Sequence, residues 1–282
     1  MKNAFSVDVE DWFCVHNLEK TFPFDQWPAQ ELRVEPSTRR ILTLLEKHNV
    51  HATFFVLGWV AEKCPRLIID LAAAGHEVAT HGYAHIIVKQ RGPEAFEEDL
   101  RRSIEVIESL VRRKVVGFRA PSFSVDYDKP WIFEILAKYG IQYDSSVYPI
   151  SLHPDYANPG TPLGVHKTVA GITEFPMSCF TFGKVVMPCS GDGYFRLLPY
   201  AYTAFGLERC NRQGRPGIFY IHPWEVDPGQ PRVKAMPIGK RLRHYVNLDK
   251  TQARLSRLLE QFDFTTVRNV LGMNLTEQSV YG

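Results

Sequence analysis

Near its amino terminus the chain reads Ala4-Phe5-Ser6-Val7-Asp8-Val9-Glu10-Asp11, and this stretch decides how the fold is interpreted. Residues 4–9 have the apolar, β-branched character of a strand, and three acids occupy its last positions. Strand alternation places Asp8 and Glu10 on the same side, while Asp11 lies just past the end. Like charges so close together repel one another unless a cation offsets them. The stretch therefore predicts a strand with a charged cluster at its carboxyl end.

Outward from this strand, short β-rich runs alternate with amphipathic helical stretches. Further strands are expected at 51–57, 76–81, 115–121, 141–146, 217–223 and 264–270. Helices are expected at 36–48, after the second strand up to about 74, and at 93–113, 129–139, 199–212 and 249–262. This rhythm is typical of parallel strands joined by crossover helices. It predicts an α/β fold with a distorted (β/α)7-type barrel in a single domain.

Two regions depart from this rhythm. Residues 147–198, with four prolines between positions 149 and 162, are expected to be an irregular insertion rather than a second domain. Within them, the glycine-punctuated run 188–196 either closes over a site or is a simple surface loop. A C-terminal extension follows from about residue 228. The chain 1–282 is thus interpreted as one domain.

The composition excludes several classes of protein. The 33 Lys and Arg against 31 Asp and Glu leave a formal charge of +2, which argues against a nucleic-acid or polybasic membrane partner. Hydrophobic residues make up 45% of the chain, which excludes disorder. No apolar run approaches the roughly 18 residues of a membrane helix, so we expect no transmembrane segment, no signal peptide and a cytoplasmic location. The five scattered cysteines are expected to be buried free thiols.

Ionisable side chains stand where the predicted strands end. The residues concerned are Asp8, Glu10, Asp11, His81, His85, Arg119, Asp144 and His222. In a β/α barrel the carboxyl ends of the strands form one rim, where active sites are built. We therefore expect these residues, from five separate segments, to meet at one site.

His81 and His85 have the spacing of a metal-binding pair, because residues four apart share one side of a helical turn. Two histidines and one carboxylate form a catalytic metal set that leaves positions open for water and substrate. The acids of the first strand supply the carboxylate. The sequence leaves open whether Glu10 or Asp11 is the ligand.

Five motifs occur in a fixed order, at residues 6–11, 81–85, 119–121, 143–149 and 218–222. They resemble the motifs of the polysaccharide deacetylases of carbohydrate esterase family 4, the NodB-homology proteins, from residue 4 to about 270. The spread first motif and the run 242–248 are similar to the subgroup found in exopolysaccharide loci, such as those associated with exosortase systems. Two positions depart from the family pattern. Val9 separates acids that are usually adjacent, and Gly82 stands where Ser or Thr normally supports the histidine pair.

The resemblance implies a role for each motif residue. Asp8 would be the general base and His222 the general acid. Glu10 or Asp11, with His81 and His85, would hold a divalent metal such as Zn²⁺.

The resemblance also implies partners for the two proton-transfer groups and a set of substrate contacts. Arg119 would pair with Asp8, and Asp144 would hold His222 in a useful tautomer. Substrate contacts are expected from Trp12, Pro121, Tyr148 and Trp224, which lie in or near the motifs.

The activity implied by the resemblance is metal-dependent removal of N-acetyl groups from an amino-sugar polysaccharide or its precursor, with release of acetate. The expected partner is therefore a carbohydrate. One alternative is an allantoinase-like hydrolase of small amides from the same superfamily. Another is a catalytically degenerate glycan-binding protein, which Gly82 and the spread acids support.

Overall fold

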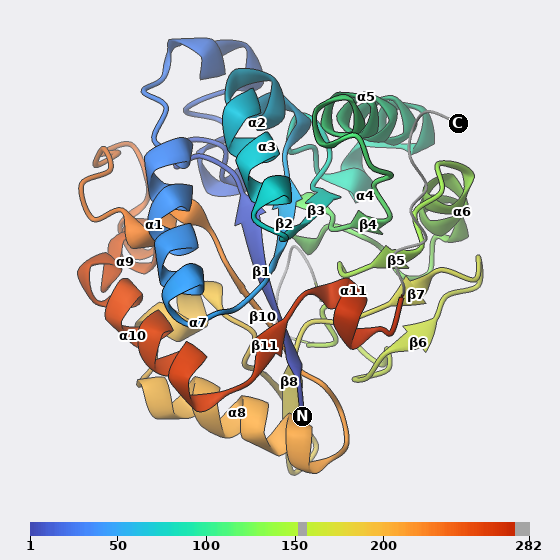
Figure 1. The fold of residues 1–282 in the computed structure, drawn as a ribbon, viewed down its shortest axis with the longest axis vertical. Helices are drawn as coiled ribbons and strands as arrows, with labels where there is room; N and C mark the ends of the chain where they lie inside the picture. The colour runs from blue at the N-terminus through green and yellow to red at the C-terminus, as the bar shows by residue number, and fades with distance from the viewer. Residues whose placement is uncertain (152–156, 274–282) are drawn as a thin grey trace.

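The computed structural model describes residues 1–151 and 157–273, which surround a curled, mostly parallel sheet (Figure 1). The strand order is β10, β1, β2, β3, β4, β5, β7, β6, and β11 also pairs with β1. The strands span Asn3–Val9 (β1), Thr53–Val56 (β2), Glu77–Thr80 (β3), Gly117–Phe118 (β4), Tyr143–Asp144 (β5), His166–Lys167 (β6), Thr173–Glu174 (β7), Ile218–Ile221 (β10) and Phe264–Thr265 (β11). The α/β class and the distorted β/α barrel predicted from the sequence are confirmed.

Strand β1 pairs with three strands, β10, β2 and β11, and all seven of its residues are buried. Its register fixes which strand ends lie level with one another. Val7 pairs with Ile221, and Val9 pairs with Val56, which pairs in turn with Thr80. Residues that directly follow these positions therefore emerge side by side at the carboxyl edge of the sheet.

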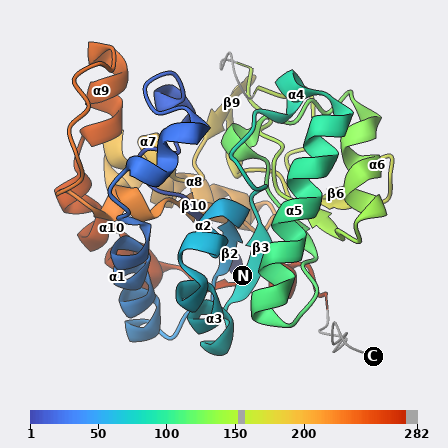
Figure 2. The same cartoon turned by 90° about the horizontal axis from the view of Figure 1, so that it is seen from above.

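Helices cover the outside of the curled sheet (Figure 2). They span Val34–Lys47 (α1), Gly58–Lys63 (α2), Pro65–Ala73 (α3), Val88–Arg91 (α4), Pro93–Val111 (α5), Pro130–Lys138 (α6), Asp192–Leu197 (α7), Tyr200–Arg212 (α8), Ile238–Tyr245 (α9), Leu248–Gln261 (α10) and Val267–Val270 (α11). Short 3-10 turns occur at His16–Leu18 (η1), Phe24–Ala29 (η2), Pro121–Phe123 (η3) and Pro223–Val226 (η4). Proline stands first in α3, α5 and α6, where its missing N–H would have no partner anyway.

Two expected elements differ from the structure. The helix expected to run to about residue 74 is divided at Cys64, because Pro65 begins α3. The strand expected over 264–270 ends at Thr265, since the Thr266 side chain caps α11 by accepting the Asn269 N–H.

Residues 147–198, expected to be irregular, contain regular structure in their described part. They hold β6, β7, α7 and a hairpin of β8 (Cys179–Phe182) and β9 (Val185–Pro188). The run that follows β9 lies against β10, because the Tyr220 N–H donates to the Ser190 carbonyl at 2.7 Å. The expectation of irregularity was wrong because paired strands and a helix link the β7 side of the sheet to β10. Residues 152–156 lie outside the described part.

One hydrophobic cluster joins the two halves of the chain, and its members run from Phe5 to Phe264. The five cysteines are free and buried, as the sequence predicts. Within 1–151 and 157–273, no helix combines the length and apolar character that crossing a membrane requires.

Candidate active site and metal centre

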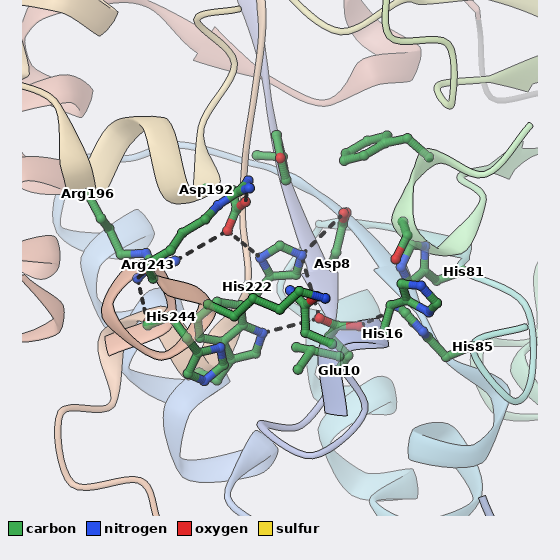
Figure 3. A pocket seen from close by; sticks show the side chains of 17 residues that line it. Asp8, Glu10, His16, His81, His85, Asp192, Arg196, His222, Arg243 and His244 are labelled. Carbon is green, nitrogen blue, oxygen red and sulfur yellow. Dashed lines mark hydrogen bonds and ion pairs between the residues drawn. The ribbon is translucent and has the colours of Figure 1, made fainter. Parts of the chain in front are cut away.

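A cavity of about 430 Å³ opens at the carboxyl ends of the strands (Figure 3). Its lining is mostly polar and comes from distant parts of the chain. The lining residues are Asp8, Glu10, Val15, His16, Asn17, His81, His85, Ser122, Phe123, Asp192, Arg196, Tyr220, His222, Trp224, Lys240, Arg243 and His244. The structure thus brings together residues from the first, second and fifth motifs.

Glu10, His81 and His85 form a compact cluster that could hold a metal ion, because one possible ligand atom from each lies within 4.8 Å of the others. These three residues are called the metal cluster below. Glu10 Oε2 lies 2.9 Å from His85 Nε2. His81 uses Nδ1 to donate to the Arg119 carbonyl at 2.8 Å, which fixes the tautomer in which Nε2 is a free electron-pair donor. The three side chains therefore present one oxygen and two nitrogens to a common point.

The protonation states of this cluster suit a divalent metal. Burial would raise the pKa of Glu10, but the imidazoles of His85 and His222 lower it to about 2. Burial lowers the pKa of His81 to about 4. A carboxylate and a neutral imidazole are the forms that bind metals. Within the described chain, the buried Glu10 Oε2 accepts no well-directed hydrogen bond, although His85 lies close. These residues fit a Zn²⁺-type ion.

Asp11, the other candidate ligand, points away from the cluster. Its carboxylate accepts backbone N–H groups of Trp12, Arg33 and Val34 at 2.7–2.8 Å. Because α1 begins at Val34, this carboxylate stabilises the amino terminus of that helix. The structure therefore assembles the metal cluster with Glu10 and leaves Asp11 as a helix-terminus acceptor.

Asp8 lies beside the metal cluster and is paired with Arg119. Arg119 Nη1 lies 2.6 Å from Asp8 Oδ1, and the guanidinium also donates to Ser6 Oγ and to both oxygens of Ser145. The arginine is fully buried and lies over the Phe55 ring at 4.1 Å. One oxygen of Asp8 is thus held by a rigid cation, while the other, Oδ2, faces His222 across 4.0 Å.

His222 follows β10 directly and lies opposite the metal cluster, level with Asp8 in the strand register. Its Nε2 lies 3.6 Å from Glu10 Oε1, and its Nδ1 lies 2.9 Å from Glu225 Oε1. Burial would lower the pKa of His222, but Glu10, Glu225 and Asp192 raise it to about 10. The imidazolium is therefore the stable form at neutral pH, with Nε2 directed into the cavity.

Asp144, expected to orient His222, does not contact it. Its Oδ1 accepts the Ser146 hydroxyl, and its strand partner is Glu174 on β7. Glu225 takes the expected place, because His222 is the N-cap of the turn η4 and Glu225 is the third residue of that turn. The same Glu225 oxygen accepts both the His222 backbone N–H and its ring Nδ1–H. A capping turn thus places the carboxylate, while Asp144 stays within the wall of the sheet.

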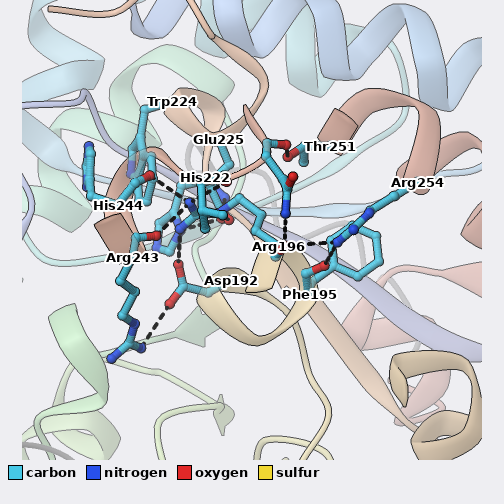
Figure 4. Close-up of polar contacts among 12 residues, drawn as sticks. Asp192, Phe195, Arg196, His222, Trp224, Glu225, Arg243, His244, Thr251 and Arg254 are labelled. Atoms are coloured by element: carbon cyan, nitrogen blue, oxygen red, sulfur yellow. Dashed lines mark hydrogen bonds and ion pairs between the residues drawn. The ribbon is translucent and has the colours of Figure 1, made fainter. Parts of the chain in front are cut away.

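A buried arginine joins the elements around His222 (Figure 4). Arg196 of α7 donates to Glu225 Oε2 at 2.6 Å and to Asp192 Oδ1 at 3.4 Å, and it caps the end of α9 through the His244 carbonyl. Asp192, His222 and Glu225 also come close enough to resemble a second metal set. Arg196 pairs with both carboxylates, and Arg243 Nη2 lies 3.6 Å from Asp192 Oδ2, so cations of the chain itself already occupy this cluster.

Of the four expected substrate contacts, one lines the cavity and three do not. Trp224 lines the cavity, donates to Glu10 Oε1 at 3.2 Å and stacks on His222 and on His244. Trp12, Pro121 and Tyr148 are buried and do not line it. Trp12 instead donates to the Glu31 carbonyl, and the Tyr148 hydroxyl accepts from Ser190. Next to Pro121, Ser122 and Phe123 line the cavity instead.

Several site residues were not predicted from the sequence. They are His16, Asp192, Arg196, Glu225 and His244. Two of these residues could have been recognised from the sequence. Glu225 stands three residues after a histidine at a strand end, the spacing of a capping turn, and Asp192 lies in the glycine-punctuated run 188–196. That run is not a simple surface loop, because it contains the start of α7 and contributes Asp192 and Arg196 to the cavity lining.

Two family models together cover nearly all of the chain. Residues 21–143 match the model "Polysaccharide deacetylase", and residues 145–272 match a "Domain of unknown function (DUF3473)". The boundary between the two matches falls at β5, so His81 and His85 lie in one match and His222 lies in the other.

Known proteins resemble the chain in sequence and in fold. It is 31% identical to the peptidoglycan deacetylase-like protein FGM2 of Gibberella zeae over 45% of this chain and 37% of that protein. It is also 31% identical to a peptidoglycan deacetylase of Helicobacter pylori over 43% of this chain and 40% of that protein. It therefore spans about two fifths of these relatives. A putative polysaccharide deacetylase from Mycobacterium smegmatis has the same fold, with a TM-score of 0.59 and 21% identity over 95% of this chain and 88% of the other.

Proposed function

We propose that the chain is a metal-dependent deacetylase of the polysaccharide deacetylase family, whose model matches residues 21–143. Its substrate would be an N-acetylated amino-sugar polysaccharide or its precursor, and its products acetate and a free amine. The observation that carries this proposal is one cavity in which the cluster of Glu10, His81 and His85 adjoins both Asp8 and His222.

The metal half of the cavity would position the substrate carbonyl and the attacking water. Glu10, His81 and His85 would hold the ion, with the Arg119 carbonyl fixing the ring of His81. A bound Zn²⁺ or similar ion supplies Lewis acidity and lowers the pKa of water toward roughly 7.

Asp8 is the base of this proposal. Arg119 holds Oδ1 at 2.6 Å, which keeps the carboxylate oriented and leaves Oδ2 facing the cavity. A carboxylate in this position takes a proton from the attacking water.

His222 is the acid of this proposal. Cleavage of an amide requires a proton on the departing nitrogen, and the Nε2 of a protonated imidazole delivers it. The carboxylates of Glu10, Glu225 and Asp192 raise the pKa of His222, and Glu225 anchors its Nδ1, so that Nε2 faces the cavity.

The proposal is tested by acetate release from N-acetylated chito-oligosaccharides, with the metal-free protein and with Zn²⁺ restored. We expect release only with the metal, and a loss of about 10²–10⁴-fold in Asp8→Asn, which removes the base. Ring opening of small ureides without acetate release would instead support the small-amide alternative. Glycan binding with no hydrolysis at all would support the degenerate binding protein.

A further inference from the structure

The turn that joins the two metal-cluster histidines is held by a side chain from α5. The Asp99 carboxylate accepts the backbone N–H of Tyr83 at 2.7 Å and that of Ala84 at 2.9 Å. The next residue, His85, has a φ of +53°. A side chain other than glycine adopts this left-handed conformation rarely, and only where its surroundings hold it there. Asp99 therefore holds the backbone N–H groups of the two residues that precede His85. His85, a proposed metal ligand, is the residue with the unfavourable conformation.

Gly82 makes this contact possible. Its φ is +74°, and a Cβ at this position would lie 2.6 Å from Asp99 Oδ2. Any side chain at position 82 would therefore collide with the carboxylate that holds the turn. Gly82 stands where the family resemblance leads us to expect Ser or Thr as the support of the histidine pair. The absence of a side chain at position 82 thus leaves the space that the Asp99 carboxylate occupies.

The same face of α5 holds the other end of the turn. Ser103, one helical turn after Asp99, donates its hydroxyl to the Gly82 carbonyl at 2.9 Å. That carbonyl also accepts the Gly58 N–H at 2.9 Å. Residues four apart lie on one face of a helix. One face of α5 therefore binds the start of the turn through Ser103 and its centre through Asp99.

We propose that Asp99 is the positioning residue of the metal centre, paired with Gly82, and that it holds His85 against Glu10 in place of a hydroxyl on the histidine turn. The proposal rests on the proposed function, because it concerns the ion which that function requires. Asp99 itself does not line the cavity that holds the metal cluster.

The test is titration of Zn²⁺ into the metal-free full chain, with circular dichroism to check the fold. We expect Asp99→Ala to weaken zinc binding by about 10–100-fold, the usual effect of removing a partner that orients metal ligands. Asp99→Asn should lie between this variant and the wild type, since the amide retains one acceptor. Glu105→Gln, on the exposed side of the same helix, should bind zinc like the wild type.

A double-mutant cycle separates the pairing from general damage to the turn. Gly82→Ser alone should weaken zinc binding, because its Cβ meets the Asp99 carboxylate. Combined with Asp99→Ala, the same substitution should cost less, because the collision is gone while the strain at positive φ is unchanged. If Asp99→Ala does not fold, the zinc affinity of Asp99→Asn, which keeps a side chain of the same size, decides the test.

Two kinds of result would contradict this inference, and they have different consequences for the proposed function. If the wild type binds zinc and Asp99→Ala binds it equally tightly, or if the two substitutions are additive, the role of Asp99 is refuted and the proposed function stands. If the wild type binds no divalent ion, the proposed function fails, and this inference fails with it.

Discussion

The two halves of the cavity differ in how the chain builds them. The metal half, with Glu10, His81 and His85, consists of residues at or near the ends of strands β1 and β3, which lie on either side of β2. The acid half places His222 after β10, but its partners Asp192 and Glu225 come from a helix and a turn that Arg196 ties together. Strand register positions the first half, whereas contacts between unrelated elements position the second. The two halves should therefore fail in different ways.

The largest effect should follow a change in the metal half. His81→Ala removes one of three ligands, so we expect loss of detectable zinc binding and of acetate release together. Both are measured on the purified variant, by zinc titration and by an acetate assay. His48→Ala, outside the cavity, is the matched control and should retain both activities. Tight zinc binding by His81→Ala would contradict the assigned ligand set.

A change at His222 should separate the two halves. In His222→Gln the leaving nitrogen has no proton donor, so kcat should fall by about 10²–10⁴-fold. Zinc binding should remain, because the ligands are unchanged. Measuring kcat and zinc affinity on the same preparation tests this. A variant that lost its zinc would show that the halves are not separable in this way.

Arg196 should affect stability more than chemistry. Arg196→Met removes the buried cation that bridges the carboxylates of Glu225 and Asp192, which we expect to lower the free energy of unfolding by about 3–5 kcal/mol. Urea denaturation of wild type and variant gives this value. Arg212→Met, which breaks an exposed pair with Glu208, is the control and should cost less than about 1 kcal/mol. Equal effects at the two positions would argue against the buried network.

The smallest effect concerns the pH dependence of the acid half. Burial and the Arg196 cation lower the pKa of His244 to about 3 from its usual 6.5, so the unfolded chain binds the proton more tightly. The stabilising contribution of neutral His244 is therefore complete above pH 6.5 and is lost as the pH falls toward 3.

At pH 5 this loss amounts to about 2 kcal/mol. His244→Phe keeps a ring stacked on Trp224 but cannot titrate. Its free energy of unfolding should therefore fall less between pH 7 and pH 5 than that of the wild type. Identical slopes in the two proteins would show that His244 is not a source of acid sensitivity.

Most of the fold could be predicted from local sequence patterns. The continuous apolar run before Asp8 predicts a buried strand, and the prolines that begin α5 and α6 mark helix starts. Residues 173–190 were missed, because β7, β8 and β9 are short and their pairing depends on distant partners. No local pattern indicates that the Ser190 carbonyl accepts the Tyr220 N–H.

In the candidate site, too, some features follow from the sequence and others only from the tertiary structure. The sequence by itself determined which strand ends carry acids and histidines, because apolar periodicity and the five motifs are properties of short segments. Tertiary structure alone decided that Glu10 rather than Asp11 joins the histidines, since the start of α1 takes the Asp11 carboxylate. It also decided that His222 pairs with Glu225 rather than Asp144. A carboxylate accepts hydrogen bonds from the donors that the packed chain brings close to it. The separation of two residues along the sequence does not determine their distance in the folded chain.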